Sequence, residues 1–156
     1  MLSFQCLSFP ELTLDQLYAL LALRQNVFVV EQDCPYLDAD GKDQAAWHLL
    51  GYEGEQLVAY TRLLPKGISY SKYAAIGRVV TDQSTRGKGY GRLLMQESIK
   101  QCQLLFGESP IKISAQTYLL DFYTSLGFQA VGEPYLEDGI PHVGMEMGWE
   151  LGSLGV

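Results

Sequence analysis

Glycine and basic residues gather in the stretch STRGKGYG, from Ser84 to Gly91, directly ahead of a segment with a helical pattern. Glycine lets a backbone come close to a ligand because it has no side chain beyond hydrogen. The amides in the first turn of a helix have no partner within the helix, and together with the helix dipole they attract anions. Arg86 and Lys88 add positive charge at the same place. The stretch therefore predicts a backbone site for a phosphate-bearing ligand.

Three phosphate-binding motifs can be compared with this stretch. A nucleotide P-loop needs Gly-Lys followed by Ser or Thr, but Lys88 is followed by Gly89. A dinucleotide fingerprint needs Gly-x-Gly-x-x-Gly and a later acid. Neither Gly87 nor Gly89 has a glycine at the sixth position, and the following strand has no acid. The third pattern, Arg/Gln-x-x-Gly-x-Gly/Ala, is satisfied by Arg86, Gly89 and Gly91, so it is the one that remains.

The segments around this loop predict its structural setting. Residues 74–80 are small or branched, which is typical of a buried strand. Residues 90–106 have a helical pattern and residues 111–116 form another short strand. Strand, helix and strand in this order make a βαβ unit, so the two strands are expected to be parallel.

The rest of the chain predicts a mixed sheet. A helix is expected over 13–32, with a capping box of Thr13 and Gln16 and with fraying near its end. The other expected elements are an edge strand over 2–9, a loop over 31–44, a hairpin over 47–64, a short helix over 118–126, strands over 128–132 and 142–149, and a turn over 135–141. We predict a single domain over residues 1–156 of the α+β (mixed α/β) class, with a parallel βαβ core in a mixed central sheet and helices on both faces.

Apolar residues at helical spacing predict which face of each long helix meets the core. For the first helix the expected stripe is Leu14, Leu17, Leu21, Val27 and Phe28. For the helix over 90–106 it is Leu93, Leu94, Ile99, Leu104 and Leu105.

Composition and charge exclude several classes of protein. Hydrophobic residues make up 47% of the chain, which is not the composition of a disordered protein. The net charge of −7 argues against a nucleic-acid partner, although residues 56–92 carry seven basic residues against Asp82 alone. No apolar run approaches the ~20 residues that span a bilayer, and no signal peptide is evident, so we expect a cytoplasmic protein without a membrane partner. Three cysteines and two histidines without paired spacing predict no metal site.

Two sequence blocks resemble the GNAT superfamily of N-acetyltransferases. Arg86-x-x-Gly89-x-Gly91 is similar to the acetyl-CoA-binding loop of that family, and DFYTSLGF, from Asp121 to Phe128, looks like its second block. The segments LRQNVFVVEQDCPYLDADGKD, HLLGY, LVAYTRLLP and DGIPHVGMEM resemble the ElaA-like subgroup in particular. The resemblance implies the acyl-CoA N-acyltransferase fold and transfer of an acetyl group from acetyl-CoA (coenzyme A) to an amine.

The resemblance also implies which residues bind the cofactor. The loop from Arg86 to Gly91 would hold the pyrophosphate, and a splay between the two parallel strands would admit the pantetheine arm. The N–H of Val80 is then a candidate donor to the thioester carbonyl. The residues expected to contact the cofactor are Arg78, Val79, Val80, Arg86, Gly87, Lys88, Gly89, Tyr90, Gly91 and Gln116.

Catalytic roles are also carried over by the resemblance or suggested by chemistry. Tyr123 matches the family tyrosine that lies near the sulfur of coenzyme A, where a phenol can donate a proton to the departing thiolate. A lysine-like amine with a pKa of about 10.4 must lose a proton before it attacks, so a base is needed. Glu31 and His142 are the candidate bases, while His48 is more typical of a structural histidine.

Several alternatives stay open at this stage. Arg24 and Arg62 could bind a substrate carboxylate or pair with the acidic loop, and that loop could favour a cationic acceptor or be a solvated surface. Cys34 and Cys102 have no evident paired base, so we predict direct attack by the amine rather than an acyl-enzyme. The alternatives to an acetyltransferase are a non-catalytic acyl-CoA-binding module and an acyltransferase similar to acyl-homoserine-lactone synthases. Many proteins of this fold dimerise, so a homodimer is an alternative to a monomer.

Overall fold

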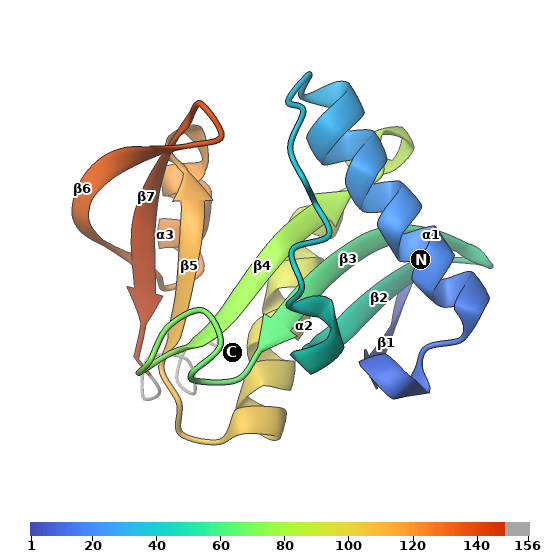
Figure 1. Cartoon of the computed structure of the whole chain (residues 1–156), viewed down its shortest axis with the longest axis horizontal. Helices are drawn as coiled ribbons and strands as arrows, with labels where there is room; N and C mark the ends of the chain where they lie inside the picture. Colours follow the sequence, from blue (N-terminus) through green and yellow to red (C-terminus); the bar gives the residue numbers. More distant parts are fainter. Residues whose placement is uncertain (149–156) are drawn as a thin grey trace.

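The structure is a computed structural model that describes residues 1–148. Within this range seven strands form one mixed sheet in the order β1-β2-β3-β4-β5-β7-β6 (Figure 1). The strands are β1 (Leu2–Ser8), β2 (Trp47–Glu53), β3 (Gln56–Leu64), β4 (Ala74–Thr81), β5 (Ile111–Gln116), β6 (Gln129–Glu137) and β7 (Ile140–Met147). The α-helices are α1 (Leu14–Arg24), α2 (Tyr90–Phe106) and α3 (Leu120–Ser125), and a π-helix over Gln25–Glu31 continues α1. Short 3-10 turns cover Phe9–Glu11, Asp43–Ala45, Gln83–Thr85 and Thr117–Leu119.

The predicted fold class is confirmed. β4, α2 and β5 form the expected βαβ unit with parallel strands, and the neighbouring pairs are antiparallel. Helix α1 lies on the near face of the sheet in Figure 1, and α2 and α3 lie behind it. The capping box at the start of α1 is also confirmed, because the Gln16 amide donates to Thr13 Oγ1 at 3.1 Å and the Thr13 amide donates to Gln16 Oε1 at 3.0 Å.

The predicted apolar face of α1 is wrong at its start. Leu14 is 85% exposed, whereas Leu20 and Leu23 are buried together with Val27 of the π-helix. The leucines of this helix are spread over two faces, and packing against Tyr60 of β3 selects the face that carries Leu20 and Leu23. The spacing of Leu20, Leu23 and Val27 is still that of one helical face.

The predicted apolar face of α2 needs a similar correction. Leu94 and Ile99 are buried as expected, but Leu93 is 45% exposed and Leu104 is 70% exposed. The other buried positions of this helix are Tyr90, Met95, Ser98 and Cys102. The helix therefore faces the sheet with a stripe that includes one polar residue, and Ser98 is accommodated by hydrogen bonds with Thr61 Oγ1 and the Leu94 carbonyl oxygen.

The turn predicted over 135–141 is much shorter in the structure. β6 continues to Glu137 and β7 begins at Ile140, so only Asp138 and Gly139 connect them. Both residues have positive φ, 51° and 77°, which is the backbone of a two-residue hairpin turn. Asp-Gly is a strong signal for such a turn, and its effect is to extend β6 and β7 to the edge of a cavity. The predicted last strand ended at Trp149, which lies outside the described residues.

The parallel strands β4 and β5 pair only at their beginnings. The register joins Ala74 with Ile111 and Ala75 with Lys112, and no later pair connects the two strands. A register shift between β3 and β4 accompanies this divergence, and Arg78 has a φ of 50°, a left-handed conformation that is uncommon for a non-glycine residue. The sheet therefore opens between β4 and β5, as Figure 1 shows.

The close packing around Gly51 of β2, between β1 and β3, can be tested by substitution. A Cβ on Gly51 would lie 2.9 Å from the Cβ of Ala59 and 3.3 Å from side-chain atoms of Leu2 and Phe4. We expect Gly51→Ala to lower the free energy of unfolding by about 1–3 kcal/mol because the strands cannot separate without losing contacts. Urea unfolding measures this change. Gly77→Ala is the control, because a Cβ at Gly77 meets no atom within 4 Å; equal stability of the two variants would contradict the predicted packing.

Candidate active site

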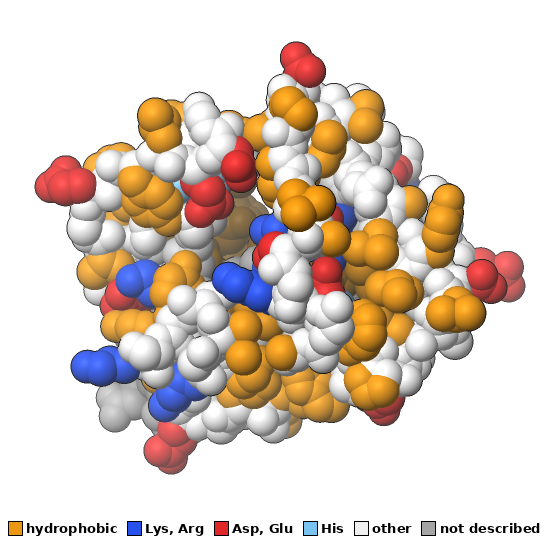
Figure 2. Space-filling view, in the orientation of Figure 1, with side chains coloured by type: hydrophobic (Ala, Val, Ile, Leu, Met, Phe, Trp, Pro, Cys, Tyr) orange, Lys and Arg blue, Asp and Glu red, His pale blue; other side chains and the backbone are white. Residues whose placement is uncertain are grey.

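A cavity of about 570 Å³ lies where β4 and β5 diverge. Figure 2 shows it as a hollow between the β5–β7 side of the molecule and the side that carries α1 and β4. β4 and β5 form its inner walls, the π-helix and the following loop form one outer wall, and the β6–β7 turn forms the other. Eight of the predicted site residues line this cavity: Arg78, Val79, Val80, Arg86, Gln116, Tyr123, Glu31 and His142.

The glycine-rich loop adjoins the cavity through Arg86 and begins α2. Gly87 and Gly89 have φ values of 89° and 78°, and a Cβ on either would meet no atom within 4 Å. The first helical hydrogen bond runs from the Leu93 amide to the Gly89 carbonyl oxygen, so the amides ahead of Leu93 in this turn have no partner within the helix. The loop thus has the backbone conformation and open space that an anion needs at a helix N-terminus.

Arg86 is held by a carboxylate of the same chain. Its guanidinium donates to both carboxylate oxygens of Glu31, with Nη2 at 2.7 Å from Oε1, and Nη2 also donates to the Thr81 carbonyl oxygen at 3.2 Å. The hydrogen bonds from Arg86 lower the pKa of Glu31, and Glu31 in turn raises the pKa of Arg86. Glu31 is therefore placed next to the expected phosphate site rather than deep in the cavity.

Lys88 and Tyr90 share a second carboxylate outside the cavity. Lys88 Nζ lies 3.1 Å from Glu53 Oε2, and the Tyr90 hydroxyl donates to the same oxygen. The hydrogen bond from Tyr90, followed by that from Lys88, lowers the pKa of Glu53. Both basic side chains of the loop are thus paired with acids. The Lys88 amide donates to the Thr85 carbonyl oxygen at 3.3 Å. The loop donors left without a partner among residues 1–148 are therefore the amides of Gly87, Gly89, Tyr90 and Gly91.

The main chain of β4 presents alternate groups to the opening. The Asp82 amide donates to the Val58 carbonyl oxygen of β3 at 2.7 Å. Because amides alternate in direction along a strand, the N–H of Val80 also points toward β3, while those of Val79 and Thr81 point toward the gap beside β5. Side chains alternate as well, since Val80 packs under α1 and Val79 packs toward α2.

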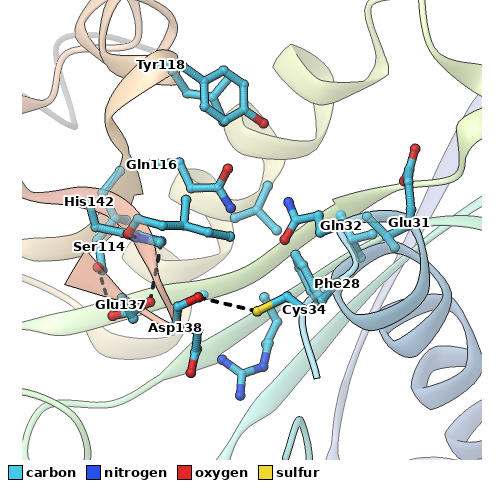
Figure 3. Close-up of a pocket in the computed structure, with 18 of the residues that line it drawn as sticks. Phe28, Glu31, Gln32, Cys34, Ser114, Gln116, Tyr118, Glu137, Asp138 and His142 are labelled. Carbon is cyan, nitrogen blue, oxygen red and sulfur yellow. Dashed lines mark hydrogen bonds and ion pairs between the residues drawn. The ribbon is translucent and has the colours of Figure 1, made fainter. Parts of the chain in front are cut away.

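Tyr123 lies on α3 with its side chain in the wall of the cavity. It is only 6% exposed, and it makes edge contacts with Phe122 and Phe128 at ring-centroid distances of 5.1 and 6.2 Å. Burial raises the pKa of Tyr123 to about 12. The phenol therefore keeps its proton at neutral pH. Gln116 ends β5 and points toward the centre of the cavity in Figure 3.

His142 faces the cavity from β7, on the opposite side from Glu31 (Figure 3). Its Nδ1 lies 2.7 Å from the Ile140 carbonyl oxygen, which can only accept, so Nδ1 carries a proton. Nε2 is then the nitrogen that can accept a proton, and it lies 3.5 Å from Glu137 Oε2. The ring is stacked on Tyr135 at a centroid distance of 6.3 Å.

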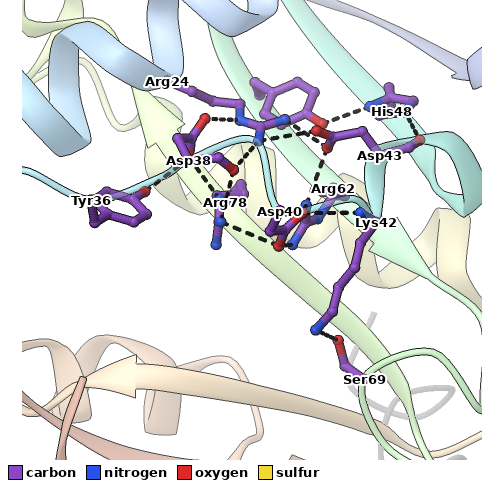
Figure 4. A network of polar contacts seen from close by, with 11 residues as sticks. Arg24, Tyr36, Asp38, Asp40, Lys42, Asp43, His48, Arg62, Ser69 and Arg78 are labelled. Carbon is purple, nitrogen blue, oxygen red and sulfur yellow. Dashed lines mark hydrogen bonds and ion pairs between the residues drawn. The ribbon is translucent and has the colours of Figure 1, made fainter. Parts of the chain in front are cut away.

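A buried network of three arginines and three aspartates holds the loop after the π-helix, residues 32–43, against the sheet (Figure 4). Arg24 is fully buried; its Nε lies 2.8 Å from Asp38 Oδ2 and its Nη1 lies 2.8 Å from Asp43 Oδ1. Burial raises the pKa of Asp43, but the hydrogen bonds and charges of Arg24 and Arg62 together outweigh burial and lower that pKa. The remaining pairs join Arg62 with Asp40 and Asp43, and Arg78 with Asp38 and Asp40.

This network decides two alternatives left open by the sequence. Arg24 and Arg62 pair with the acidic loop and are buried, so they do not present a site for a substrate carboxylate. The idea that the loop is a solvated surface or attracts a cation is wrong for Asp38, Asp40 and Asp43, because arginines neutralise them.

His48 belongs to the same network as a structural residue. Its Nε2 lies 2.9 Å from the Asp43 carbonyl oxygen and its Nδ1 lies 2.6 Å from the Tyr60 hydroxyl. The carbonyl requires a proton on Nε2, so Nδ1 accepts from Tyr60. Burial lowers the pKa of His48, which keeps the ring neutral.

Glu137, Ser114 and Thr81 line the cavity but were missed as site residues in the sequence. Glu137 was assigned to a turn, although the Asp-Gly signal places it at the end of a strand, opposite the start of β7. Ser114 and Thr81 carry no pattern that separates them from other strand residues.

Among residues 1–148, no group of three potential metal ligands comes together and no helix is long and apolar enough to cross a membrane.

A family model, related sequences and solved structures all match this chain over most of its length. Residues 27–149 match the family model "Acetyltransferase (GNAT) domain". The chain is 45% identical to protein ElaA of Escherichia coli K12 over 93% of this chain and 95% of that protein. The crystal structure of E. coli ElaA superposes with a TM-score of 0.88 at 44% identity, covering 94% of this chain and 99% of that one.

Two further solved structures have the same fold. An acyl-CoA N-acyltransferase from Pseudomonas aeruginosa is 43% identical with a TM-score of 0.90, and the match covers 95% of this chain and all of that one. A GNAT family acetyltransferase from Elizabethkingia anophelis with acetyl-CoA bound is 15% identical with a TM-score of 0.63, covering 94% and 97% of the chains, and it supports the fold alone.

The buried network predicts a large loss of stability when one cation is removed. We expect Arg24→Met to lower the free energy of unfolding by about 3–5 kcal/mol, because Asp38 and Asp43 would lose their buried partner. Arg92→Met is the matched control, since within residues 1–148 the exposed Arg92 guanidinium has a hydrogen bond to Ser125 Oγ and a cation–π contact with Phe122 but no carboxylate partner. Chemical unfolding of both variants measures the difference. A loss for Arg24→Met no greater than that for Arg92→Met would show that the network does not hold the loop.

Proposed function

We propose that this chain, which belongs to the GNAT acetyltransferase family, moves an acetyl group from acetyl-CoA to an amine by direct attack. The observation that carries the proposal is the meeting of a glycine-opened helix N-terminus with the divergence of β4 and β5 at one cavity. A phosphate-bearing ligand with a long amide-containing arm fits both features at once. A neighbour of the same fold, from Elizabethkingia anophelis, has acetyl-CoA bound, and the proposal extends that cofactor to this chain.

The cofactor fits the residues that are present. The unpaired amides of Gly87, Gly89, Tyr90 and Gly91 would hold the pyrophosphate, with Arg86 and Lys88 adding charge. Arg86 would be shared between the pyrophosphate and Glu31, or released by Glu31. Acetyl-CoA, when bound, supplies an acetyl group activated as a thioester.

The main chain of β4 would hold the pantetheine arm. The amides of Val79 and Thr81 point into the gap, so they are the better donors to the amides of the arm and the thioester carbonyl. Val80 would contribute packing, because its own N–H points toward β3. Arg78 and Gln116 line the same gap and complete the proposed cofactor contacts.

Tyr123 and His142 divide the proton transfers in this proposal. His142 Nε2 takes the proton of the ammonium group, and the neutral nitrogen then forms a bond to the acetyl carbonyl carbon as the carbon–sulfur bond breaks. The departing sulfur takes a proton from the Tyr123 hydroxyl, which recovers it from the acylated nitrogen through solvent. The net change converts an ammonium and acetyl-CoA into an amide, the free thiol and one proton.

Glu31 is the weaker candidate for the base. Its carboxylate is bonded to Arg86 at the phosphate end, and its pKa is lowered by that contact. A base with a lowered pKa is poorly matched to removing a proton from an ammonium near neutral pH. His142 has an available Nε2 and lies across the cavity from Glu31, which holds Arg86.

The loop assignment predicts that backbone geometry at Gly89 controls cofactor affinity. Gly89→Ala puts a side chain into a left-handed position at the helix N-terminus, and we expect it to weaken acetyl-CoA binding at least tenfold in isothermal titration. Gly67→Ala is the matched control, because Gly67 has a φ of 96° and equally open space but lies away from the cavity. Loss of stability with unchanged affinity in both variants would count against the loop as the cofactor site.

The role of Tyr123 predicts a change in turnover without a change in cofactor affinity. We expect Tyr123→Phe to lower kcat by about 10²-fold or more, in the range that a general acid contributes. Because the pKa of Tyr123 is raised to about 12, the wild-type enzyme should keep this acid through pH 10. Steady-state kinetics from pH 7 to 10 measures the loss of kcat in the variant and the pH dependence of the wild type. Acetyl-CoA and octanoyl-CoA are compared as donors, because an acyltransferase similar to acyl-homoserine-lactone synthases would prefer the longer acyl chain. An unchanged kcat in the variant across this range would remove Tyr123 as the acid.

A further inference from the structure

Glu137 is positioned by side chains of its own sheet and not by a basic residue. Ser114 Oγ donates to Glu137 Oε1 at 3.2 Å and is itself hydrogen-bonded to the Tyr135 hydroxyl. Glu137 Oε2 lies 3.5 Å from His142 Nε2. Within the described residues no lysine or arginine pairs with this carboxylate, so its negative charge stays uncompensated when His142 is neutral.

His142 supplies the second, independent feature. Its side chain is 8% exposed and Nε2 makes no hydrogen bond to any of residues 1–148, with Glu137 at 3.5 Å as its charged neighbour. This nitrogen belongs to a residue that lines the cavity, so a ligand or water there can supply its hydrogen bond. Figure 3 shows Ser114, Glu137 and His142 together on the side of the cavity formed by β5, β7 and the β6–β7 turn.

The opposite wall contributes no free positive charge at this end. Arg78 faces the cavity, but its Nε lies 2.8 Å from Asp38 Oδ1 and its Nη2 lies 3.0 Å from the Asp38 carbonyl oxygen. Cys34 reaches across the opening and donates from Sγ to the Asp138 carbonyl oxygen at 3.5 Å (Figure 3). The end of the cavity under this contact is therefore anionic, in contrast to the loop end that carries Arg86.

We infer that Glu137 is the acceptor-recognition residue and that the acceptor is a small cationic alkylamine without a carboxylate beside its amine. The inference rests on the proposed function and specifies its acceptor. The Glu137 carboxylate binds the ammonium group by a charge-assisted hydrogen bond and places it next to His142 Nε2, which removes the proton. A carboxylate on the carbon that carries the amine would be repelled by Glu137.

A matched pair of acceptors tests this selectivity. Pentylamine and norleucine differ by the single carboxylate beside the amine. We expect wild-type kcat/KM for pentylamine to exceed that for norleucine at least tenfold, with thiol release from acetyl-CoA as the readout.

The variant Glu137→Gln separates binding from chemistry. It keeps the size of the half-exposed side chain and removes its charge, so we expect KM for pentylamine to rise about tenfold while KM for acetyl-CoA is unchanged. The ratio of kcat/KM for pentylamine to that for norleucine should also be smaller in Glu137→Gln than in the wild type. Glu133→Gln is the control, because Glu133 is an exposed carboxylate of the same strand that does not line the cavity.

The outcomes distinguish failure of this inference from failure of the proposed function. Equal use of both acceptors, an unchanged KM for pentylamine in Glu137→Gln, or a wild type that binds acetyl-CoA but acetylates neither acceptor would overturn the role of Glu137. A wild type that does not bind acetyl-CoA in isothermal titration would instead overturn the proposed function.

Discussion

The structure depends on the early separation of β4 and β5. These parallel strands pair at two positions and then diverge, which leaves main-chain donors of β4 facing a cavity rather than a neighbouring strand. Backbone groups that are removed from water need a partner, and in a continuous sheet the next strand would supply it. A ligand that carries amide groups can take the place of that strand. The cavity is thus a gap in a hydrogen-bonded ladder, and its contents are expected to complete the ladder.

Charge divides the cavity into two ends. The chain is acidic overall, yet it places Arg86 and Lys88 at the glycine loop and pairs each with a carboxylate, Glu31 and Glu53. Such pairs keep the loop close to neutral until an anion with stronger charge and better donors competes for it. At the other end the three arginines that could attract anions are bound by the loop over residues 32–43. The carboxylate of Glu137 then sets the local potential, and it does so beside an available histidine nitrogen.

Local pattern predicted the segments whose structure depends on nearby residues. The helix over 90–106, the strand over 111–116 and the glycine-opened loop were all predictable because turn chemistry and periodicity act over a few residues. The arginine–aspartate network was not, since it joins Arg24 with Asp43 and Arg62 with Asp40 through pairings that only the folded sheet creates. The helix faces were mistaken for the same reason, because leucines on two sides of α1 become core or surface only once Tyr60 is in place. Glu137 was missed because the Asp-Gly hairpin was read as a long turn.

Residue-resolved amide hydrogen exchange with and without acetyl-CoA tests the central claim most directly. If the cofactor completes the ladder of β4, the amides of Val79 and Thr81 should exchange more slowly when it is bound, while the amide of Val80, which points toward β3, should change little. Exchange at Val79 and Thr81 that is unaffected by saturating acetyl-CoA would contradict the account.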